Sequence, residues 1–99
     1  MIREEKELAF KEWFRLYQNY PNPFNPVTKI NYELSVENYV SLKVYDILGN
    51  EIKTLISQRQ IEGIYEAEFD GSDLSSGIYF YTLNAGKKYS QTKRMLLLK

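Results

Sequence analysis

The sequence predicts an all-β protein, an antiparallel β-sandwich of about six or seven strands preceded by one short α-helix. Three observations support this fold class. Apolar and polar residues alternate with a period of two in most segments after residue 28, turn signals recur about every 8–12 residues, and tyrosine, which suits half-buried pleated surfaces, occurs nine times. A chain of 99 residues has room for one such domain.

The period-two alternation locates the strands. In the first of them Ile30, Tyr32 and Leu34 share one face, which we expect to be buried. The closing run from Met95 to Leu98 is too uniformly apolar for alternation to orient it. The strands expected from this pattern are residues 29–34, 40–44, 52–56, 64–69, 78–83 and 89–98.

Turn chemistry supports these boundaries. Residues 46–50 read as a tight hairpin in which Asp46 caps the turn and Gly49 supplies a positive φ. Residues 84–87 read as a second short hairpin. Residues 73–79, where a leucine and a Gly-containing turn lead into Tyr79, resemble the tyrosine corner of immunoglobulin-like sandwiches. A core tyrosine after an ordinary loop explains the same segment equally well.

The segment before the first strand has a different pattern. Phe10, Trp13, Phe14 and Tyr17 follow helical spacing, so an amphipathic helix is expected over residues 3–17. Its apolar stripe is expected to pack on the domain's own surface or on a second copy of the chain rather than on a membrane or a foreign partner. Three prolines within residues 21–26 then exclude helix and favour an extended segment or an edge strand. We therefore expect a helix or linker remnant over residues 1–19 and the sandwich over residues 20–99.

The composition argues against an enzyme. The chain has no histidine and no cysteine, which removes the usual general base, the commonest metal ligand and any thiolate site. Glu66 and Glu68 share a strand face, but exposed alternating glutamates are ordinary on sheets. The oxygen-rich segment 70–73 is better explained by Asx-turn chemistry than by a calcium site. No catalytic, metal or cofactor site is therefore expected.

Charge and hydropathy narrow the remaining functions. The formal net charge is zero, so neither nucleic acid nor a membrane surface is an expected partner. No stretch approaches the roughly 20 apolar residues of a membrane span. The first ten residues carry acids where a secretion signal would have a basic region, so no signal peptide is expected in this chain.

Four motifs carry a family resemblance. In their order and spacing they strongly resemble the C-terminal sorting domain of the type IX (Por) secretion system, over about residues 14–99. The motifs are Tyr20-Pro21-Asn22-Pro23-Phe24-Asn25-Pro26, Val40-Ser41-Leu42-Lys43-Val44-Tyr45-Asp46 running into Gly49, Ser76-Gly77-Ile78-Tyr79-Phe80-Tyr81, and Lys93-Arg94-Met95-Leu96-Leu97-Leu98-Lys99.

The resemblance implies a seven-stranded immunoglobulin-like sandwich at the C-terminus of a secreted or outer-surface cargo protein. It implies two protein partners, the outer-membrane translocon and a sortase-like peptidase that in many cases removes the domain. The principal recognition element would be the last strand, Lys93, Arg94, Met95, Leu96, Leu97, Leu98 and Lys99. The framework that presents it would be Pro21, Asn22, Pro23, Phe24, Asn25, Pro26, Asp46, Gly49, Gly77 and Tyr79.

Two other functions fit the same residues. The chain is also similar to the sandwich domain of the flagellar hook-capping protein and to fibronectin-type spacers, which would make it a structural or adhesive module. A spacer should tolerate deletion of residues 93–99, whereas a sorting signal should not. A carbohydrate-binding sandwich is a third hypothesis, and it would use exposed aromatic residues such as Tyr39, Tyr45 and Tyr89.

Overall fold

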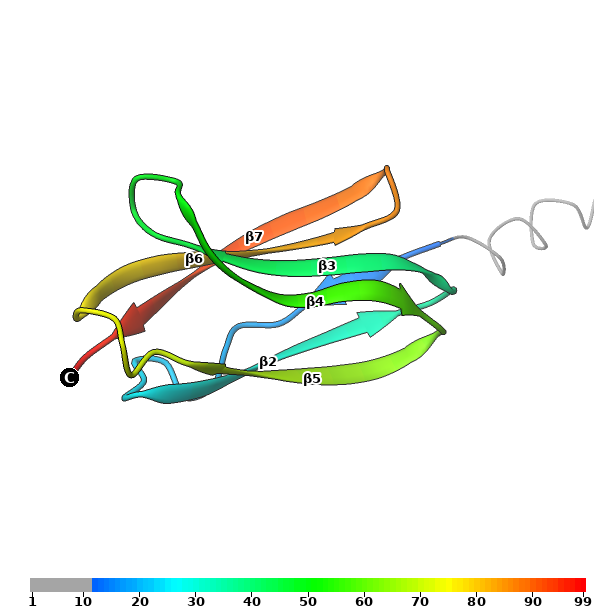
Figure 1. The fold of residues 1–99 in the computed structure, drawn as a ribbon. Coiled ribbons are helices and arrows are strands. Elements are labelled where there is room, and N and C mark those ends of the chain that lie inside the picture. Colours follow the sequence, from blue (N-terminus) through cyan, green and yellow to red (C-terminus); the bar gives the residue numbers. More distant parts are fainter. Residues whose placement is uncertain (1–11) are drawn as a thin grey trace, which may run out of the picture.

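The computed structural model describes residues 12–99, which form seven strands and, within that range, no helix. The predicted all-β class is therefore confirmed, and Figure 1 shows the strands running along one long direction in two facing layers. The strands are β1 (Phe14–Leu16), β2 (Val27–Leu34), β3 (Asn38–Tyr45), β4 (Glu51–Gln60), β5 (Gly63–Asp70), β6 (Gly77–Ala85) and β7 (Tyr89–Leu97).

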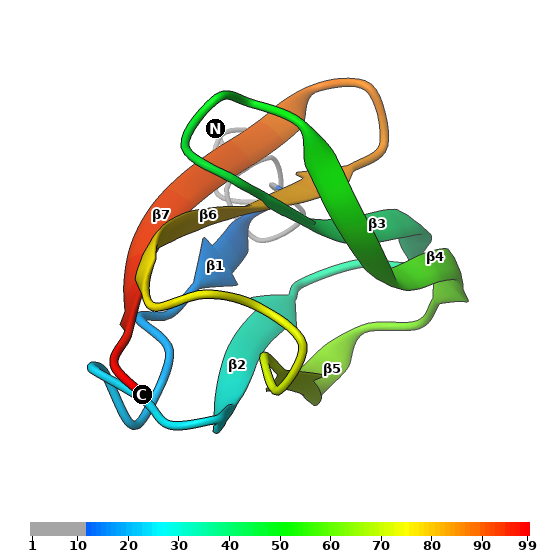
Figure 2. The ribbon, with the colours of Figure 1, turned by 60° about the vertical axis from the view of Figure 1, so that its left-hand side comes forward.

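The strands are divided between two antiparallel sheets. One sheet has three strands in the order β1-β2-β5, and the other has four in the order β4-β3-β6-β7. The short turn from β4 to β5 crosses between the sheets, which places these two edge strands on one side of the molecule (Figure 2). The other two edge strands, β1 and β7, lie on the opposite side. The C-terminal strand is therefore an edge strand.

The core lies between the sheets and follows the predicted alternation. On β2 the side chains of Ile30, Tyr32 and Leu34 point inward and are buried, as predicted. The Tyr32 hydroxyl donates a hydrogen bond of 2.6 Å to Gln60 Oε1, so this buried polar group has a partner. Burial of each large apolar side chain contributes about 1.5–3 kcal/mol. The other residues of the core include Val40, Leu42, Val44, Ala67, Phe69, Tyr79, Tyr81, Leu83, Met95 and Leu97.

The predicted N-terminal helix is wrong where the structure describes it. Phe14–Leu16 form strand β1, which pairs with β2 in the register Phe14↔Leu34. Phe14 and Leu16 point into the core, and Arg15 between them points to solvent. Aromatic residues have modest helix propensity, and pairing with β2 outweighs it. The remainder of the predicted helix, residues 3–11, lies outside the described residues.

Strand β4 is longer than predicted. The alternation indicated only residues 52–56, whereas the strand spans Glu51–Gln60. Its second half is polar and pairs with the beginning of β3 in the register Asn38↔Gln60 and Ser41↔Ser57. Backbone hydrogen bonds extend this edge strand beyond its apolar residues, and hydrophobic periodicity does not report such an extension.

The predicted turns are present. Gly49 has φ +88° in the turn from β3 to β4, and Gly86 has φ +63° in the turn from β6 to β7. The backbone N–H of Ser72 donates to Asp70 Oδ1 over 2.9 Å, which is the expected Asx turn. The Tyr79 hydroxyl donates to the carbonyl of Ser75, four residues upstream, over 2.7 Å. Of the two explanations for residues 73–79, the hydrogen bond of a tyrosine corner is the one observed.

Replacement of Tyr79 by Phe tests the contribution of this hydrogen bond. The ring and its packing stay, so we expect the free energy of unfolding to fall by about 1 kcal/mol. The matched control is Tyr20→Phe, because the Tyr20 side chain is 81% exposed. Urea denaturation of both variants measures the difference. Equal stability of the two variants would contradict a role for the Tyr79 hydroxyl.

The buried tyrosines predict a loss of stability at alkaline pH. Burial raises the pKa of Tyr32 and of Tyr81 from 10.0 to about 12. The fold thus favours the neutral phenols, and this contribution is complete below pH 10 and is lost as the pH rises towards 12. Free energies of unfolding measured between pH 9 and pH 12 should fall over that window, and less steeply in Tyr32→Phe. A flat profile would contradict the prediction.

Candidate recognition surface at the C-terminal strand

The last strand divides its apolar residues between the core and solvent. Strand β7 pairs with β6 so that Met95 lies opposite Tyr79 and Leu97 lies opposite Gly77. Met95 and Leu97 point inward and are fully buried, so they complete the core. Leu98 lies beyond the strand and is 51% exposed. The run that alternation could not orient is therefore oriented by its pairing with β6.

The outer edge of β7 is partly covered by residues 18–24, here called the capping segment. Phe24 forms a parallel bridge with Leu97: the Phe24 N–H donates to the Leu96 carbonyl over 2.9 Å, and the Leu98 N–H donates to the Phe24 carbonyl over 3.0 Å. The Asn22 side-chain oxygen accepts from the Leu96 N–H over 3.0 Å. Gln18 Nε2 donates to the Arg94 carbonyl over 2.7 Å. Every contact is made with residues 94–98, that is, with the end of β7 and the residue that follows it.

A buried polar network holds the capping segment in place. The Tyr81 hydroxyl accepts from the Asn19 N–H over 2.8 Å and donates to the Tyr17 carbonyl over 2.7 Å. The Asn19 side-chain amide donates to Thr28 Oγ1 over 3.0 Å, and the Thr28 hydroxyl donates to the Pro21 carbonyl over 2.8 Å. Asn19 and Thr28 are both buried. Buried groups with satisfied hydrogen bonds fix the backbone in one conformation.

Phe24 adds an apolar anchor to this network. Its side chain is buried in the core and meets the Phe69 ring edge-on, with 6.0 Å between centroids. Phe24 belongs to the predicted framework, and the structure places it beside the last strand. Gln18 and Asn19 were not predicted, because a polar contact with a residue more than 60 positions away has no local sequence signal. Thr28, which bonds Asn19 and Pro21, was not predicted either.

The first half of the β7 edge has no partner strand within residues 12–99. In an antiparallel strand, alternate residues direct their backbone groups to the same side. Leu96 and Leu98 direct theirs towards the capping segment, so Ser90 and Thr92 direct theirs to the same outer side. The exposed side chains towards the end of the strand belong to Arg94, Leu98 and Lys99.

The remaining predicted framework residues occupy two places. Gly77 and Tyr79 lie on β6 directly beside β7, and the proline-rich residues 21–26 run past the end of β7. Asp46 and Gly49 lie elsewhere, in the turn between β3 and β4. Backbone N–H donors, that of Asn50 first, lower the pKa of the Asp46 carboxyl.

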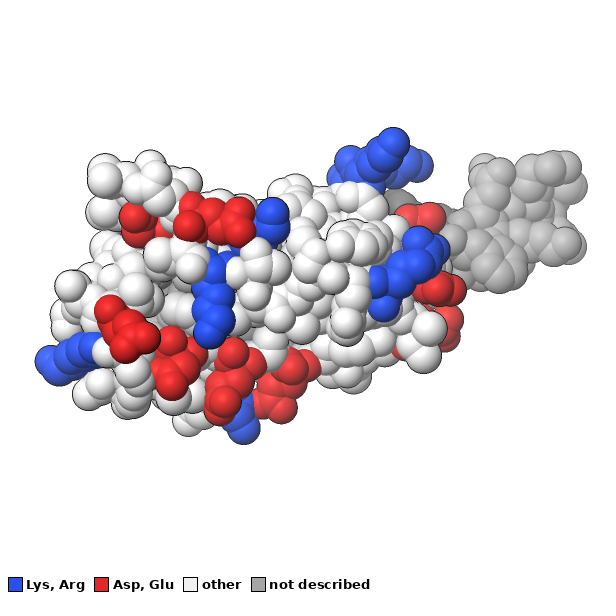
Figure 3. Space-filling view, viewed as in Figure 1, with Lys and Arg blue, Asp and Glu red and all other residues white. Residues whose placement is uncertain are grey.

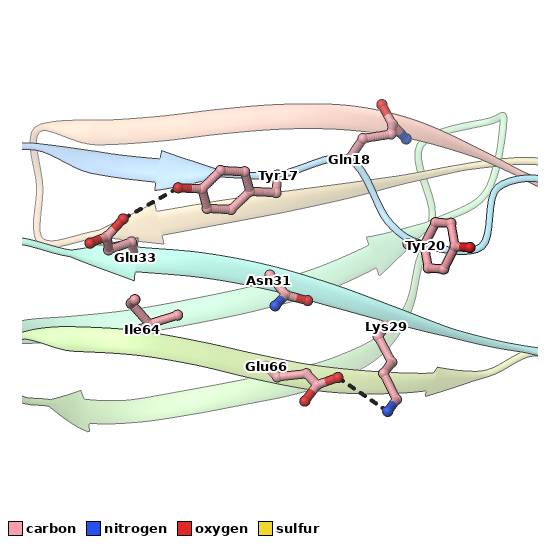
Figure 4. Close-up of a pocket in the computed structure, with 8 residues that line it drawn as sticks. All are labelled: Tyr17, Gln18, Tyr20, Lys29, Asn31, Glu33, Ile64 and Glu66. Atoms are coloured by element: carbon pink, nitrogen blue, oxygen red, sulfur yellow. Dashed lines mark hydrogen bonds and ion pairs between the residues drawn. The ribbon is translucent and has the colours of Figure 1, made fainter.

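A shallow groove of about 500 Å³ lies on the outer face of the three-stranded sheet. Figure 4 shows Tyr17 directed towards Glu33 at one end and Lys29 directed towards Glu66 on β5. The Tyr17 hydroxyl donates to Glu33 Oε1 over 3.3 Å, and Lys29 Nζ lies 3.3 Å from Glu66 Oε2. Both carboxylates are therefore engaged by a neighbouring side chain, as on an ordinary sheet surface.

The three tyrosines considered for carbohydrate binding do not form a row. Tyr39 and Tyr45 lie at opposite ends of β3. Tyr89 lies on β7, packs its ring on Phe14 with 4.7 Å between centroids, and donates its hydroxyl proton to the Phe14 carbonyl. Among residues 12–99 no three histidine, cysteine or acidic side chains lie close enough to hold a metal ion, and no helix is long and apolar enough to cross a membrane.

Known proteins resemble the chain in fold and in sequence. The β-glucosidase of Listeria innocua, solved with isofagomine, has a part with similar fold: TM-score 0.54, 6% identity, covering 88% of this chain and 16% of that one. The same enzyme with glucose gives a TM-score of 0.47 at 7% identity, covering 89% and 16%. The chain thus spans about a sixth of these proteins, and the first likeness shows the fold alone. A search of curated proteins finds no match.

Sequence similarity is more specific. Residues 18–98 match the secretion system C-terminal sorting domain. The match begins at the first residue of the capping segment and ends one residue beyond β7, so it includes both sides of the contact described above. The chain belongs to the family of C-terminal sorting domains of the type IX secretion system.

Proposed function

We propose that the outer-membrane translocon of the type IX system recognises this domain at the C-terminal end of β7. The sorting role itself follows from the family, which is non-catalytic. The observation that carries the proposal is the position of the last strand at the edge of a sheet, with the side chains of Arg94, Leu98 and Lys99 exposed. Edge strands and exposed terminal side chains are the elements that a protein partner can read.

In the proposal, the buried residues of β7 stabilise the fold and its exposed residues contact the partner. Met95 and Leu97 are buried and stabilise the sandwich, so they present the strand without contacting a partner. The backbone from Arg94 onward is occupied by the capping segment. Recognition of the folded domain therefore uses the exposed side chains there, together with the open backbone edge at Ser90 and Thr92.

The finer features of the family belong to the same proposal. The two facing sheets and the hydrogen bond from Tyr79 to Ser75 support an immunoglobulin-like sandwich. The sorting domain, expected over residues 20–99, would also include residues 14–19, because β1 pairs with β2 and Gln18 and Asn19 contact β7 and β6. The residues before them would lead into the domain from a cargo protein. The cargo would be delivered to the cell surface or the medium, and a sortase-like peptidase would remove the domain there.

A secretion assay with matched charge reversals tests the proposal. A reporter carrying a signal peptide and the whole 99-residue chain at its C-terminus would be expressed in a type IX-competent host. We expect surface delivery of the unaltered fusion and periplasmic retention of R94E/K99E, because the variant reverses two exposed charges at the proposed recognition end. The control K87E/K88E makes the same charge change in the exposed turn between β6 and β7 and should be delivered normally.

Delivery of R94E/K99E at the level of the unaltered fusion would contradict recognition at the end of β7. Deletion of residues 93–99 is a less specific test, because it removes the buried Met95 and Leu97 and destabilises the core. If the chain were only a structural spacer, neither the charge reversals nor the deletion would change the surface delivery of the fusion. The charge reversals therefore separate a sorting signal from a spacer without altering the core.

A further inference from the structure

The turn between β3 and β4 is held rigidly by polar residues. Asp46 Oδ1 accepts from the backbone N–H groups of Leu48 and Asn50, both over 2.9 Å, and Oδ2 accepts from the Asn50 side chain over 3.2 Å. The Gly49 N–H donates to the Asp46 carbonyl over 3.0 Å. Since these contacts involve only the backbone of Leu48 and nothing of Ile47, the turn does not require large apolar side chains there.

Two large apolar side chains nevertheless occupy this turn. Ile47 is 67% exposed and Leu48 is 83% exposed; together they are here called the apolar tip. Small polar residues or glycine are usual at such positions, and exposed aliphatic groups add nothing to the stability of the turn. A rigid turn that presents apolar groups loses little conformational freedom on binding, which favours a contact with a partner.

The apolar tip and the C-terminus lie at the same end of the molecule. Figure 1 shows the turn from β3 to β4 above the C-terminus at one end, with the turns from β4 to β5 and from β6 to β7 at the other. Leu98, the exposed apolar residue after β7, is also at the end that carries the tip. A protein that reads the end of β7 can therefore approach both features from one side.

The charge around the apolar tip favours a protein over a lipid surface as the partner that contacts it. The tip is flanked in sequence by Asp46 and Glu51, and Figure 3 shows acidic side chains beneath the turn on this face. Glu51 Oε1 lies 3.5 Å from Lys43 Nζ, which balances its charge, whereas the hydrogen-bond donors to Asp46 are the neutral N–H groups of Leu48 and Asn50, so Asp46 keeps its negative charge beside the tip. The Asp46 carboxylate beside the tip would be repelled by an anionic bilayer, whereas a pocket in a protein can place basic residues opposite it.

We propose that the apolar tip is a second docking point, which inserts into an apolar socket bordered by basic residues on the same protein that reads the end of β7. This inference rests on the proposed function and extends it to a second contact. The tip residues make no contribution to the core, so their role is separable from folding.

The chain offers a closely matched control. Ile61 and Ile64, beside the turn between β4 and β5, are 66% and 73% exposed, nearly the same as the tip, but they lie at the opposite end of the molecule. In the secretion assay with the whole chain, we expect I47S/L48S to reduce surface delivery by about tenfold or more, the size of effect typical of residues central to an interface. I61S/I64S should be delivered like the unaltered fusion.

Thermal unfolding of the purified variants checks that they are folded. If I47S/L48S is unstable, the single variant L48Q replaces it, and L48Q should also lower surface delivery. Equal surface delivery of I47S/L48S and the unaltered fusion, or equal losses of delivery in I47S/L48S and I61S/I64S, would overturn the second docking point. If either result is obtained while R94E/K99E stays in the periplasm, recognition at the end of β7 still stands. Delivery of R94E/K99E would remove both proposals.

Binding to lipid vesicles tests directly whether the apolar tip contacts a lipid surface instead of a protein. The purified unaltered chain should not bind phosphatidylglycerol vesicles in physiological salt. Binding that is lost in I47S/L48S and kept in I61S/I64S would show that the tip inserts into a lipid surface, and the protein socket would be wrong.

Discussion

The unpaired edge of the C-terminal strand is the constraint on which this structure depends. A strand at a sheet edge exposes backbone donors and acceptors that bind water or another strand indiscriminately. Here the part from Arg94 onward is satisfied by Gln18, Asn22 and Phe24, which come from the beginning of the domain. Each such hydrogen bond contributes about 0.5–1.5 kcal/mol, and together they fix where the last strand ends.

This arrangement links recognition to folding. The residues that cap the edge are more than 70 positions away in the sequence from the residues that they contact, so the edge is completed only when the whole domain has folded. The capping segment is in turn held by Tyr81, on the strand next to β7, through Asn19. A partner that reads the exposed residues of the finished strand would thereby distinguish folded domains from unfolded ones.

The sequence predicted the parts of this fold that local patterns encode. Alternation identified the buried faces of β2 and β3, and turn chemistry identified the turns at Gly49 and Gly86. The helix prediction failed because the aromatic residues at helical spacing do not share a buried face: Trp13 and Tyr17 are both 41% exposed, whereas Phe14 is buried together with Leu16, two residues further on, as in a strand. The network of Asn19 and Tyr81 could not be predicted, since its partners are distant polar residues. Family motifs identified the proline-rich segment without indicating that it caps the last strand.

Hydrogen exchange at individual backbone amides of β7 tests the capped edge most directly. The Leu96 and Leu98 amides should exchange at least about tenfold more slowly than those of Ser90 and Thr92, although all four face the outer side of an edge strand. In Asn22→Ala, exchange should accelerate at Leu96 and stay slow at Leu98, whose acceptor is the Phe24 carbonyl. Equally fast exchange at all four amides of the unaltered protein would contradict a capped edge.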